Sequence, residues 1–353
     1  MGNRLYGRED TALRELMQNA VDATRVRLAV ECKNDHPANC DDKCADDLES
    51  LYNEYYKNEH LSYPITVKLS VEIDPLSGER ETWLAIEDNG VGMARDTLEQ
   101  FFLQVGRSRW KTDPIIRSLH ISTIGEFGIG FMSTFMLSDK TVIDTQSCLP
   151  NEAGIRATVY NWSGFLATEP LDRQKPGTTV RLRLRRDVAT YLQEHLEERI
   201  EYWCPFLEFP IEISTLSKTT RLAPIDRDTT SSSKLPSLNN TTLINIPIRE
   251  SGSLCQIEGR RRSLSEDPLP SLSQDGLCIP DVPPPLLDTP EQSLLRLSRI
   301  RVDLRKSDRE RLDLSRNLTE GGASSLWSRI VPQVWRAIAN HALHQRGARD
   351  LFS

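Results

Sequence analysis

The sequence lacks several features that would assign it to common classes of protein. No run of hydrophobic residues approaches the ~20 needed to cross a membrane, so no membrane association is expected. No apolar segment follows Met1, so a secretory signal is not indicated. Only seven of the 353 residues are cysteine, an odd number. Reduced thiols in the cytoplasm are therefore expected, rather than a disulfide framework.

The chain also lacks an excess of positive charge. Its 44 Lys and Arg residues are outnumbered by 51 Asp and Glu, which gives a net charge of −7. That balance argues against general affinity for nucleic acid, and no specific nucleic-acid partner is expected. The hydrophobic fraction of 38% and the charged fraction of 27% are typical of a globular protein, and 353 residues suffice for two domains.

Residues 8–31 have the spacing of one amphipathic helix. Within it, Glu15, Asn19 and Asp22 are spaced i, i+4 and i+7, so they fall within about 60° of one another on the helix surface. The opposite stripe is apolar and would face a core: Leu13, Leu16, Met17, Ala20 and Val21. Two carboxylates and an amide are oxygen ligands of the kind that Mg²⁺ takes, usually together with phosphates. Taken alone, the stripe is also explained by a solvated polar face.

The order of the elements predicts a layered α+β domain. A polar insertion at 32–62 is expected to be partly helical around 48–56. Residues 65–73 alternate strictly between apolar and polar side chains, and a turn at Ser77-Gly78 returns the chain into a strand at 83–86, which predicts an antiparallel hairpin. Two helices and three strands are expected next, at 95–105, 131–137, 140–147, 154–161 and 178–185. This order favours helices on one face of a mixed sheet and differs from the βαβ alternation of a dinucleotide-binding fold.

The remainder of the chain is less regular. A helix is expected at 187–202 and a closing amphipathic helix at 322–346. Residues 215–300 are rich in Ser, Thr and Pro, which is typical of long loops in a second domain or of an extended linker.

One group of metal-ligating residue types falls in the insertion. It comprises Cys32, His36, Cys40 and Cys44. Their spacing lacks the paired ligands of common structural zinc sites, and the segment is rich in Asp and Asn. A solvated loop or helical insertion explains this group better than a zinc site does.

Three glycine-containing motifs follow the helix. Residues 88–93 read Asp-Asn-Gly-Val-Gly-Met at the end of a predicted strand, which indicates a tight turn with one fixed acceptor, suited to an exocyclic amine such as that of adenine. Residues 125–130 read Gly-Glu-Phe-Gly-Ile-Gly before an apolar helix, where backbone N–H groups can converge on an anion. This is not a Walker A loop, because no Gly-Lys-Ser/Thr follows. Gly177-Thr178 opens a strand and is uninformative alone.

In this order, the four motifs resemble the GHKL superfamily of ATP-binding proteins. That superfamily includes type II topoisomerase subunits, heat-shock chaperones, sensor histidine kinases and mismatch-repair ATPases. The sequences around Arg14-Glu15 and Ile124–Phe131 look most like the ninety-kilodalton heat-shock chaperone family. Two later segments, residues 208–211 and 312–317, resemble the start of that family's middle domain and the loop whose arginine reaches the ATP γ-phosphate.

The resemblance implies a fold and a domain division. Residues 1–186 would form a two-layer α/β sandwich of the Bergerat, GHKL type, with a mixed, mainly antiparallel sheet covered by helices on one face. It would include the insertion at 32–62 and an ATP lid at about 94–124. Residues 187–353 would form a partial middle-like α/β domain with Ser/Pro-rich loops at 215–300.

The resemblance also implies roles for individual residues. Glu15 would be the general base that orients the attacking water, and Asn19 would bind Mg²⁺. Asp88 would accept from the adenine amine. Arg316 would add positive charge at the transferring phosphoryl group. The remaining ATP-binding residues would be Gly90, Gly92, Met93, Gly125, Glu126, Phe127, Gly128, Ile129, Gly130, Phe131 and Thr178, while Asp22 would have a supporting role.

The function that the resemblance implies is an ATP-hydrolysing conformational switch acting on protein clients, with ATP and Mg²⁺ as cofactors. The alternatives are a divergent ATPase in a signalling or defence module with effector proteins as partners, and a non-catalytic nucleotide-binding fragment. A histidine kinase is disfavoured because no phosphoacceptor helix is evident. The family's N-terminal strand and C-terminal dimerisation domain have no counterpart, so dimerisation is left open and the chain is expected to be a fragment, a truncated reading frame or a short divergent relative.

Overall fold

The computed structural model describes residues 6–35, 45–98, 116, 118–119, 133–150, 152–160, 165–225, 231–235, 241–248, 253–258, 272–279, 300–305 and 322–344. The chain divides into two compact units. The first comprises residues 1–199 and 208–224, and the second comprises residues 200–207 and 225–353. The domain boundary expected after residue 186 stays a prediction.

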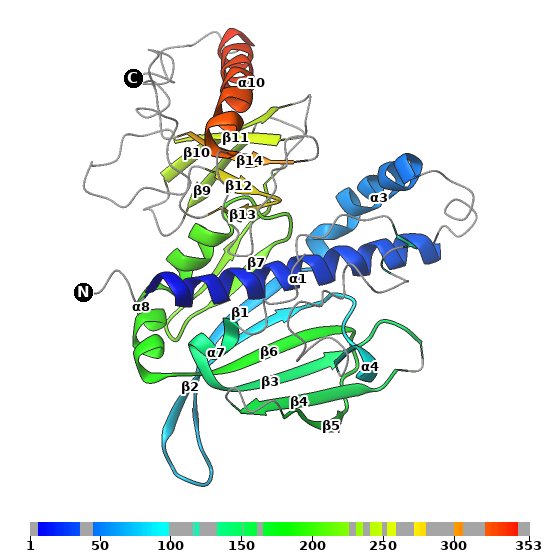
Figure 1. Ribbon diagram of the computed structural model, residues 1–353, viewed down its shortest axis with the longest axis vertical. Coiled ribbons are helices and arrows are strands. Elements are labelled where there is room, and N and C mark those ends of the chain that lie inside the picture. The colour runs from blue at the N-terminus through cyan, green and yellow to red at the C-terminus, as the bar shows by residue number, and fades with distance from the viewer. Residues whose placement is uncertain are drawn as a thin grey trace. The chain divides into compact units, whose positions relative to one another are not determined.

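The first unit is an eight-stranded sheet with the long helix α1 (Tyr6–Asp35) lying across one face (Figure 1). The strand order is β5-β4-β3-β6-β2-β1-β7-β8, and every neighbouring pair is antiparallel except the parallel pair β1 and β7. The strands are β1 (Ile65–Ile73), β2 (Arg80–Asp88), β3 (Ser138–Gln146), β4 (Gly154–Tyr160), β5 (Ala167–Leu171), β6 (Gly177–Leu184), β7 (Ile211–Ser214) and β8 (Thr219–Leu222). The predicted α+β class, with a mainly antiparallel sheet and helices on one face, is confirmed.

The alternation in residues 65–73 gives the expected strand and hairpin. Ile65, Val67 and Leu69 are buried, whereas Lys68 between them is exposed. Val67 lies opposite Ile86 in the antiparallel pair with β2. Period-2 alternation of this kind places one face of a strand in the core, and here it selects both the strand and its register.

The other helices of this unit are shorter or peripheral. They are α3 (Ala45–Glu59), the 3-10 turn η2 (His60–Ser62), α4 (Arg95–Thr97), α7 (Thr134–Leu137) and α8 (Arg186–Trp203), of which residues 200–203 belong to the second unit. Helix α3 falls in the polar insertion and packs against α1. The helices expected at 95–105 and 131–137 are described only at α4 and α7, because residues 99–115 and 120–132 lie outside the described part.

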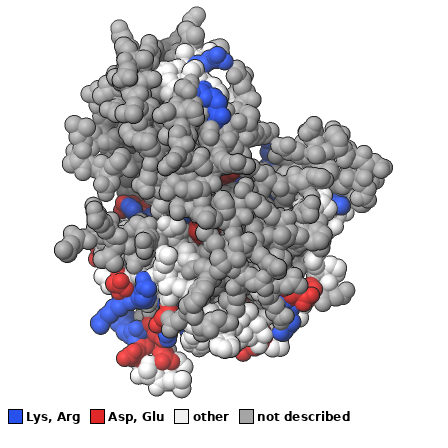
Figure 2. All heavy atoms as spheres, in the orientation of Figure 1, with Lys and Arg blue, Asp and Glu red and all other residues white. Residues whose placement is uncertain are grey.

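The sheet face opposite the long helix carries paired charges. Arg183 on β6 contacts Glu81 on β2 at 2.8 Å and Asp139 on β3 at 2.7 Å. Arg156 on β4 makes a two-point contact with Asp144 on β3 at 2.6 and 2.8 Å. Figure 2 shows acidic and basic side chains interspersed where this view exposes described residues. The charges of the outer face are therefore largely locally compensated.

The second unit contains a six-stranded sheet of order β13-β12-β14-β11-β10-β9, with α10 (Gly322–His344) against it. The strands are β9 (Ser231–Leu235), β10 (Thr241–Ile248), β11 (Ser253–Glu258), β12 (Leu272–Gln274), β13 (Leu277–Cys278) and β14 (Ile300–Leu304). Ile246 and Val302 pack with Ile330 and Val334 of the helix in one core cluster. The extended-linker interpretation of residues 215–300 is therefore wrong for their described parts, which form strands of a folded sheet.

Candidate functional site

Helix α1 presents the three polar residues of the predicted stripe, and the structure does not leave them solvated. Glu15 is 8% exposed and Asp22 is fully buried, while Asn19 is half-buried. The apolar stripe opposite is buried as expected, at Leu13, Leu16, Met17, Ala20 and Val21. The solvated-face interpretation is therefore wrong. Burial of carboxylates is costly unless each has a partner, so their retention here points to a site or a structural network.

Glu15 has its own cationic neighbour. The Arg14 Nη2 atom lies 3.0 Å from Glu15 Oε1, and the Arg14 side chain is almost fully buried. A guanidinium at this distance gives the Glu15 carboxylate a charge-assisted hydrogen bond, which fixes the orientation of the carboxylate.

Asp88 ends strand β2 as a buried carboxylate, 7% exposed. Its Oδ1 atom accepts from the backbone N–H of Gly90 at 2.8 Å and from that of Thr178 at 3.2 Å. Burial raises the pKa of Asp88 to about 7, against the lowering effect of these two donors. Two neutral donors thus fix the orientation of a carboxyl group whose charge is incompletely compensated.

The glycines of the first motif bring the loop after Asp88 into close contact with its surroundings. A Cβ atom on Gly90 would lie 2.5 Å from the Ala23 carbonyl carbon of α1, and the Val91 N–H donates to the Ala23 carbonyl at 2.9 Å. Gly92 has φ +63°, and a Cβ there would lie 1.8 Å from the Gln146 carbonyl oxygen at the end of β3. Only glycine fits these two positions, and the loop is held between α1 and β3 as a result.

The third glycine motif, Gly177-Thr178, also lies against Asp88. Gly177 has φ +130°, and a Cβ there would lie 2.3 Å from the Asp88 carbonyl oxygen. Thr178 follows it at the start of β6, opposite Asp88 in register. Strand pairing thus brings together two motifs that lie 90 residues apart in the sequence.

Thr145 is a residue of this region that the sequence interpretation missed. Its hydroxyl lies 3.0 Å from that of Thr178 and accepts from the Met93 N–H at 2.9 Å. Thr145 is fully buried on β3, directly opposite Thr178. A lone threonine in a strand carries no motif, and only the register of β3 with β6 would have identified it.

Several predicted residues lie outside the described part. These are the second glycine motif with its flanking residue, Gly125, Glu126, Phe127, Gly128, Ile129, Gly130 and Phe131, and the arginine of the later loop, Arg316. Of the expected lid at 94–124, residues 94–98, 116 and 118–119 are described. The structure thus brings together Glu15, Asn19 and Asp22 on one helix, and Asp88, Gly90, Gly92, Met93 and Thr178 around one carboxylate.

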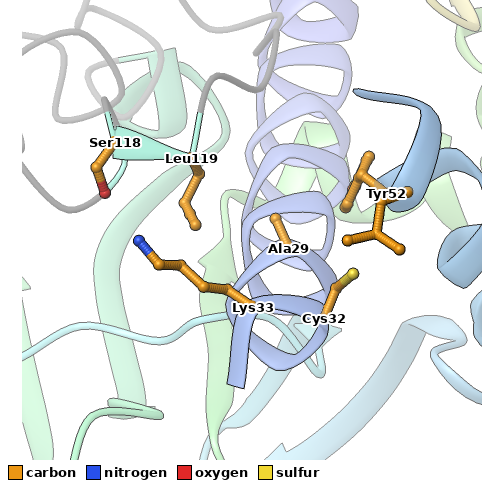
Figure 3. A pocket seen from close by; sticks show the side chains of 7 residues that line it. Ala29, Cys32, Lys33, Tyr52, Ser118 and Leu119 are labelled. Carbon is orange, nitrogen blue, oxygen red and sulfur yellow. The ribbon is translucent and has the colours of Figure 1, made fainter. Parts of the chain in front are cut away.

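A small cavity lies beside the C-terminal half of α1 (Figure 3). Its volume is about 30 Å³, and Figure 3 shows Cys32 and Lys33 of α1, Tyr52 of α3 and Ser118 and Leu119 of the predicted lid segment around it. That volume matches roughly one water molecule, whereas ligand pockets measure about 300–1,000 Å³. This cavity is not the nucleotide site.

The donor set favours a purine nucleotide with a hard cation. A buried carboxylate fixed by backbone donors can accept from an exocyclic amine. Glu15 and Asn19 offer oxygen atoms that could hold Mg²⁺ together with phosphates. Among the described residues, no group of three His, Cys, Asp or Glu side chains is placed to hold a metal by itself. Of the insertion residues weighed for zinc, only Cys32 is described; it is buried.

Comparison with known proteins agrees with this chemistry. The profile of the family described as histidine kinase-, DNA gyrase B- and HSP90-like ATPase matches residues 8–159. Proteins named chaperone protein HtpG from Methylorubrum populi and Methylorubrum extorquens are 27% and 28% identical to this chain over 219 and 221 residues. A protein of the same name from Oceanobacillus iheyensis is 26% identical over 220 residues. These alignments cover 59–60% of this chain, which spans 30% of the length of each relative.

Proposed function

We propose that the chain is an ATP-binding and ATP-hydrolysing conformational switch of the heat-shock chaperone type, because residues 8–159 match the histidine kinase-, DNA gyrase B- and HSP90-like ATPase family. Its partners would be client proteins, in keeping with the name chaperone that its relatives carry. Among the helices that the structure describes, none is long and apolar enough to span a membrane.

The observation that carries the proposal is the environment of Asp88. The carboxylate is buried, fixed by two backbone donors and surrounded by glycines that admit no side chain. A group of this kind recognises a hydrogen-bond donor on a flat ring, because one oxygen is already engaged and the other can accept. Asp88 would accept from the adenine amine, with Gly90, Gly92, Met93 and Thr178 around the base.

The residues of α1 would supply the chemistry. Glu15 would orient the attacking water and take its proton, and the contact with Arg14 would fix the position of the Glu15 carboxylate. Asn19 would contribute its amide oxygen to Mg²⁺, which when bound neutralises charge on the phosphates. Backbone contacts to the phosphates would come from Gly125, Gly128, Ile129, Gly130 and Phe131. The same ATP-binding segment would include Glu126 and Phe127, and Arg316 would stabilise charge on the transferring group.

The test begins with calorimetric titration of the chain with ATP and ADP, with and without Mg²⁺, followed by phosphate release. We expect binding of both nucleotides and slow, Mg²⁺-dependent turnover. Glu15→Ala should abolish turnover and leave ATP binding largely intact. Glu31→Ala, on the same helix and paired with Arg27, should change neither. A wild-type chain that binds neither nucleotide would refute the proposal, and turnover by Glu15→Ala would remove Glu15 from the mechanism.

A further inference from the structure

A buried ion pair joins α1 to a segment 183 residues away. Arg25 Nε lies 2.9 Å from Glu208 Oε2, and Arg25 Nη2 lies 2.5 Å from Glu208 Oε1. The two side chains are 7% and 11% exposed. This two-point geometry fixes the orientation of both groups as well as their distance.

Arg25 stands beside the predicted nucleotide face of α1. It follows Asp22 by one helical turn, and its Nη1 atom lies 3.8 Å from Asp22 Oδ1. Asp22 is fully buried. The guanidinium therefore lies between two buried carboxylates, one on its own helix and one on a distant segment.

Glu208 begins the segment that leads into the central sheet. It is the first residue of the first unit after residues 200–207, which belong to the second unit. Two residues later, the Pro210 carbonyl accepts from the Ile65 N–H at 2.9 Å, and β7 then pairs in parallel with β1. Glu208 therefore lies just before β7, the strand by which the chain re-enters the sheet of the first unit.

The insertion helix α3 contacts both members of the pair. The Tyr52 hydroxyl donates to the Arg25 carbonyl at 2.8 Å, and the Tyr56 hydroxyl donates to Glu208 Oε2 at 3.2 Å. The Tyr56 ring also meets the Phe209 ring edge-on, with centroids 5.6 Å apart. Helix α3 therefore contacts both members of the pair through Tyr52 and Tyr56, and the insertion helps to fix the pair within the first unit.

A buried ion pair of this kind contributes more to the relative position of the two segments that it joins than to the net stability of the fold. Desolvation offsets much of the attraction between the two charges, and the two-point contact persists only while α1 and the segment after Glu208 keep their relative position. We propose that Arg25 is a positioning residue of the nucleotide site, and that its pair with Glu208 couples nucleotide binding at α1 to the ordering of residues 208–214. The inference rests on the proposed function.

The first test measures ADP affinity in the full chain by calorimetry. Glu208→Gln keeps the shape of the side chain and removes the charge, and it should weaken ADP binding by about fivefold or more, the lower end of typical coupling between sites. The matched control is Glu81→Gln, which breaks the pair with Arg183 on the outer sheet face. The control should change ADP affinity less than about twofold, because distant sites are nearly independent.

The second test separates positioning from stability. In the wild type, ADP should slow hydrogen exchange of the β7 amides, and in Glu208→Gln it should not. The double variant Arg25→Gln/Glu208→Gln removes both charges of the pair but also takes the cationic neighbour from buried Asp22, so it should unfold at no higher denaturant concentration than Glu208→Gln alone. It should also lack the ADP-dependent protection of β7. A pair with only a structural role would lower the denaturation midpoints of both variants and leave the ADP-dependent protection of β7 in place.

The outcomes distinguish the two proposals. If the wild type binds ADP but Glu208→Gln binds it as tightly as Glu81→Gln does, the coupling is refuted and the proposed function stands. If Glu208→Gln does not fold, the wild-type exchange experiment decides, since absence of ADP-dependent protection in β7 refutes the coupling. If the wild type binds no nucleotide, both proposals fail.

Discussion

At the scale of single residues, Asp88 carries the most specific chemistry of the described part. Its two backbone donors orient one oxygen, and burial opposes its ionisation. Both effects come from the fold, because the donors belong to a loop and to a strand that are far apart in the sequence. The residue is therefore a sensitive reporter of whether the site takes an adenine nucleotide.

Replacement of Asp88 by Asn should weaken nucleotide binding itself. The amide side chain could present its NH₂ group where an acceptor is needed, and it would lack the charge that strengthens the hydrogen bond. We expect a loss of about 1–3 kcal/mol in the binding free energy of ADP, measured by calorimetry. The variant Asp187→Asn, at the start of α8, is the control and should bind ADP normally. Unchanged affinity in Asp88→Asn would place the adenine acceptor elsewhere.

The raised pKa of Asp88 predicts a pH dependence with a definite sign. Binding needs the ionised carboxylate, so ADP affinity should be constant above pH 7 and fall by about tenfold per unit once the pH is well below the pKa of about 7. Calorimetric titrations between pH 5.5 and 8.5 would test this, with Asp88→Asn as the variant that lacks the titrating group. An affinity in the wild type that is flat down to pH 5.5 would contradict it.

The raised pKa of Asp88 also makes the free energy of unfolding depend on pH. The sign is opposite to that for an ion-paired carboxylate, whose pKa is lowered. Asp88 titrates near 7 in the folded chain against 3.8 for the unfolded reference, so the folded state binds its proton more tightly. Its contribution to the free energy of unfolding is therefore largest below pH 4 and declines as the pH rises to about 7. In the proposed site, a bound nucleotide would offset this cost at neutral pH, because it would supply a donor to the carboxylate.

At the scale of elements, the glycine loop after β2 is held between α1 and β3. Gly92→Ala should prevent this packing, because a Cβ would lie 1.8 Å from the Gln146 carbonyl oxygen. Gly78→Ala is the matched control: φ is +74° there and +63° at Gly92, but nothing lies within 4 Å of its Cβ. Both variants carry the cost of a positive φ, about 1–2 kcal/mol.

The clash should separate the two variants. In urea denaturation followed by circular dichroism, we expect Gly92→Ala to lose about 3 kcal/mol more than Gly78→Ala, since backbone atoms must move to admit the new carbon. Gly78→Ala should keep normal ADP affinity, whereas Gly92→Ala should lose it. Equal stability of the two variants would show that the loop can relax away from β3.

Elements with a strong period were predictable from the sequence, and those defined by tertiary pairing were not. The alternation in residues 65–73 predicted β1, and the apolar stripe of residues 13–21 predicted α1. Strand β5 was missed because Ala167–Leu171 contains Pro170 and no alternation. Strand β9 reads Ser-Ser-Ser-Lys-Leu, which resembles a loop in composition, yet it pairs with β10.

In the candidate site, too, residues in motifs could be predicted from the sequence, and residues brought together by tertiary pairing could not. Glu15, Asn19 and Asp88 stand in motifs with fixed spacing, so the sequence identified them. Thr145 became visible only through its register with Thr178. The Arg25–Glu208 pair could not be foreseen either, because its members lie 183 residues apart and the resemblance of residues 208–211 to a family segment did not connect them with α1. Sequence patterns identify residues that act within one helix or strand. Contacts between such elements can be identified only from the three-dimensional fold.

At the scale of the whole molecule, the predicted roles divide between the two units. Glu15, Asn19, Asp88 and Thr178 all belong to the first unit, whereas Arg316 belongs to the second. An arginine that acts only on charge developed at the transferring phosphoryl group stabilises the transition state more than the bound substrate. Arg316 should therefore affect turnover and leave binding unchanged.

The variant Arg316→Ala tests this division in the full chain. We expect ATP and ADP affinities within about twofold of wild type and a turnover number lower by at least about 100-fold, in line with the loss of a charged group that acts in the transition state. Arg336→Ala, an exposed arginine of α10 in the same unit, is the control and should preserve turnover. A parallel loss of ATP affinity in Arg316→Ala would instead make this arginine part of ground-state binding. Normal turnover would confine the predicted catalytic residues to the first unit.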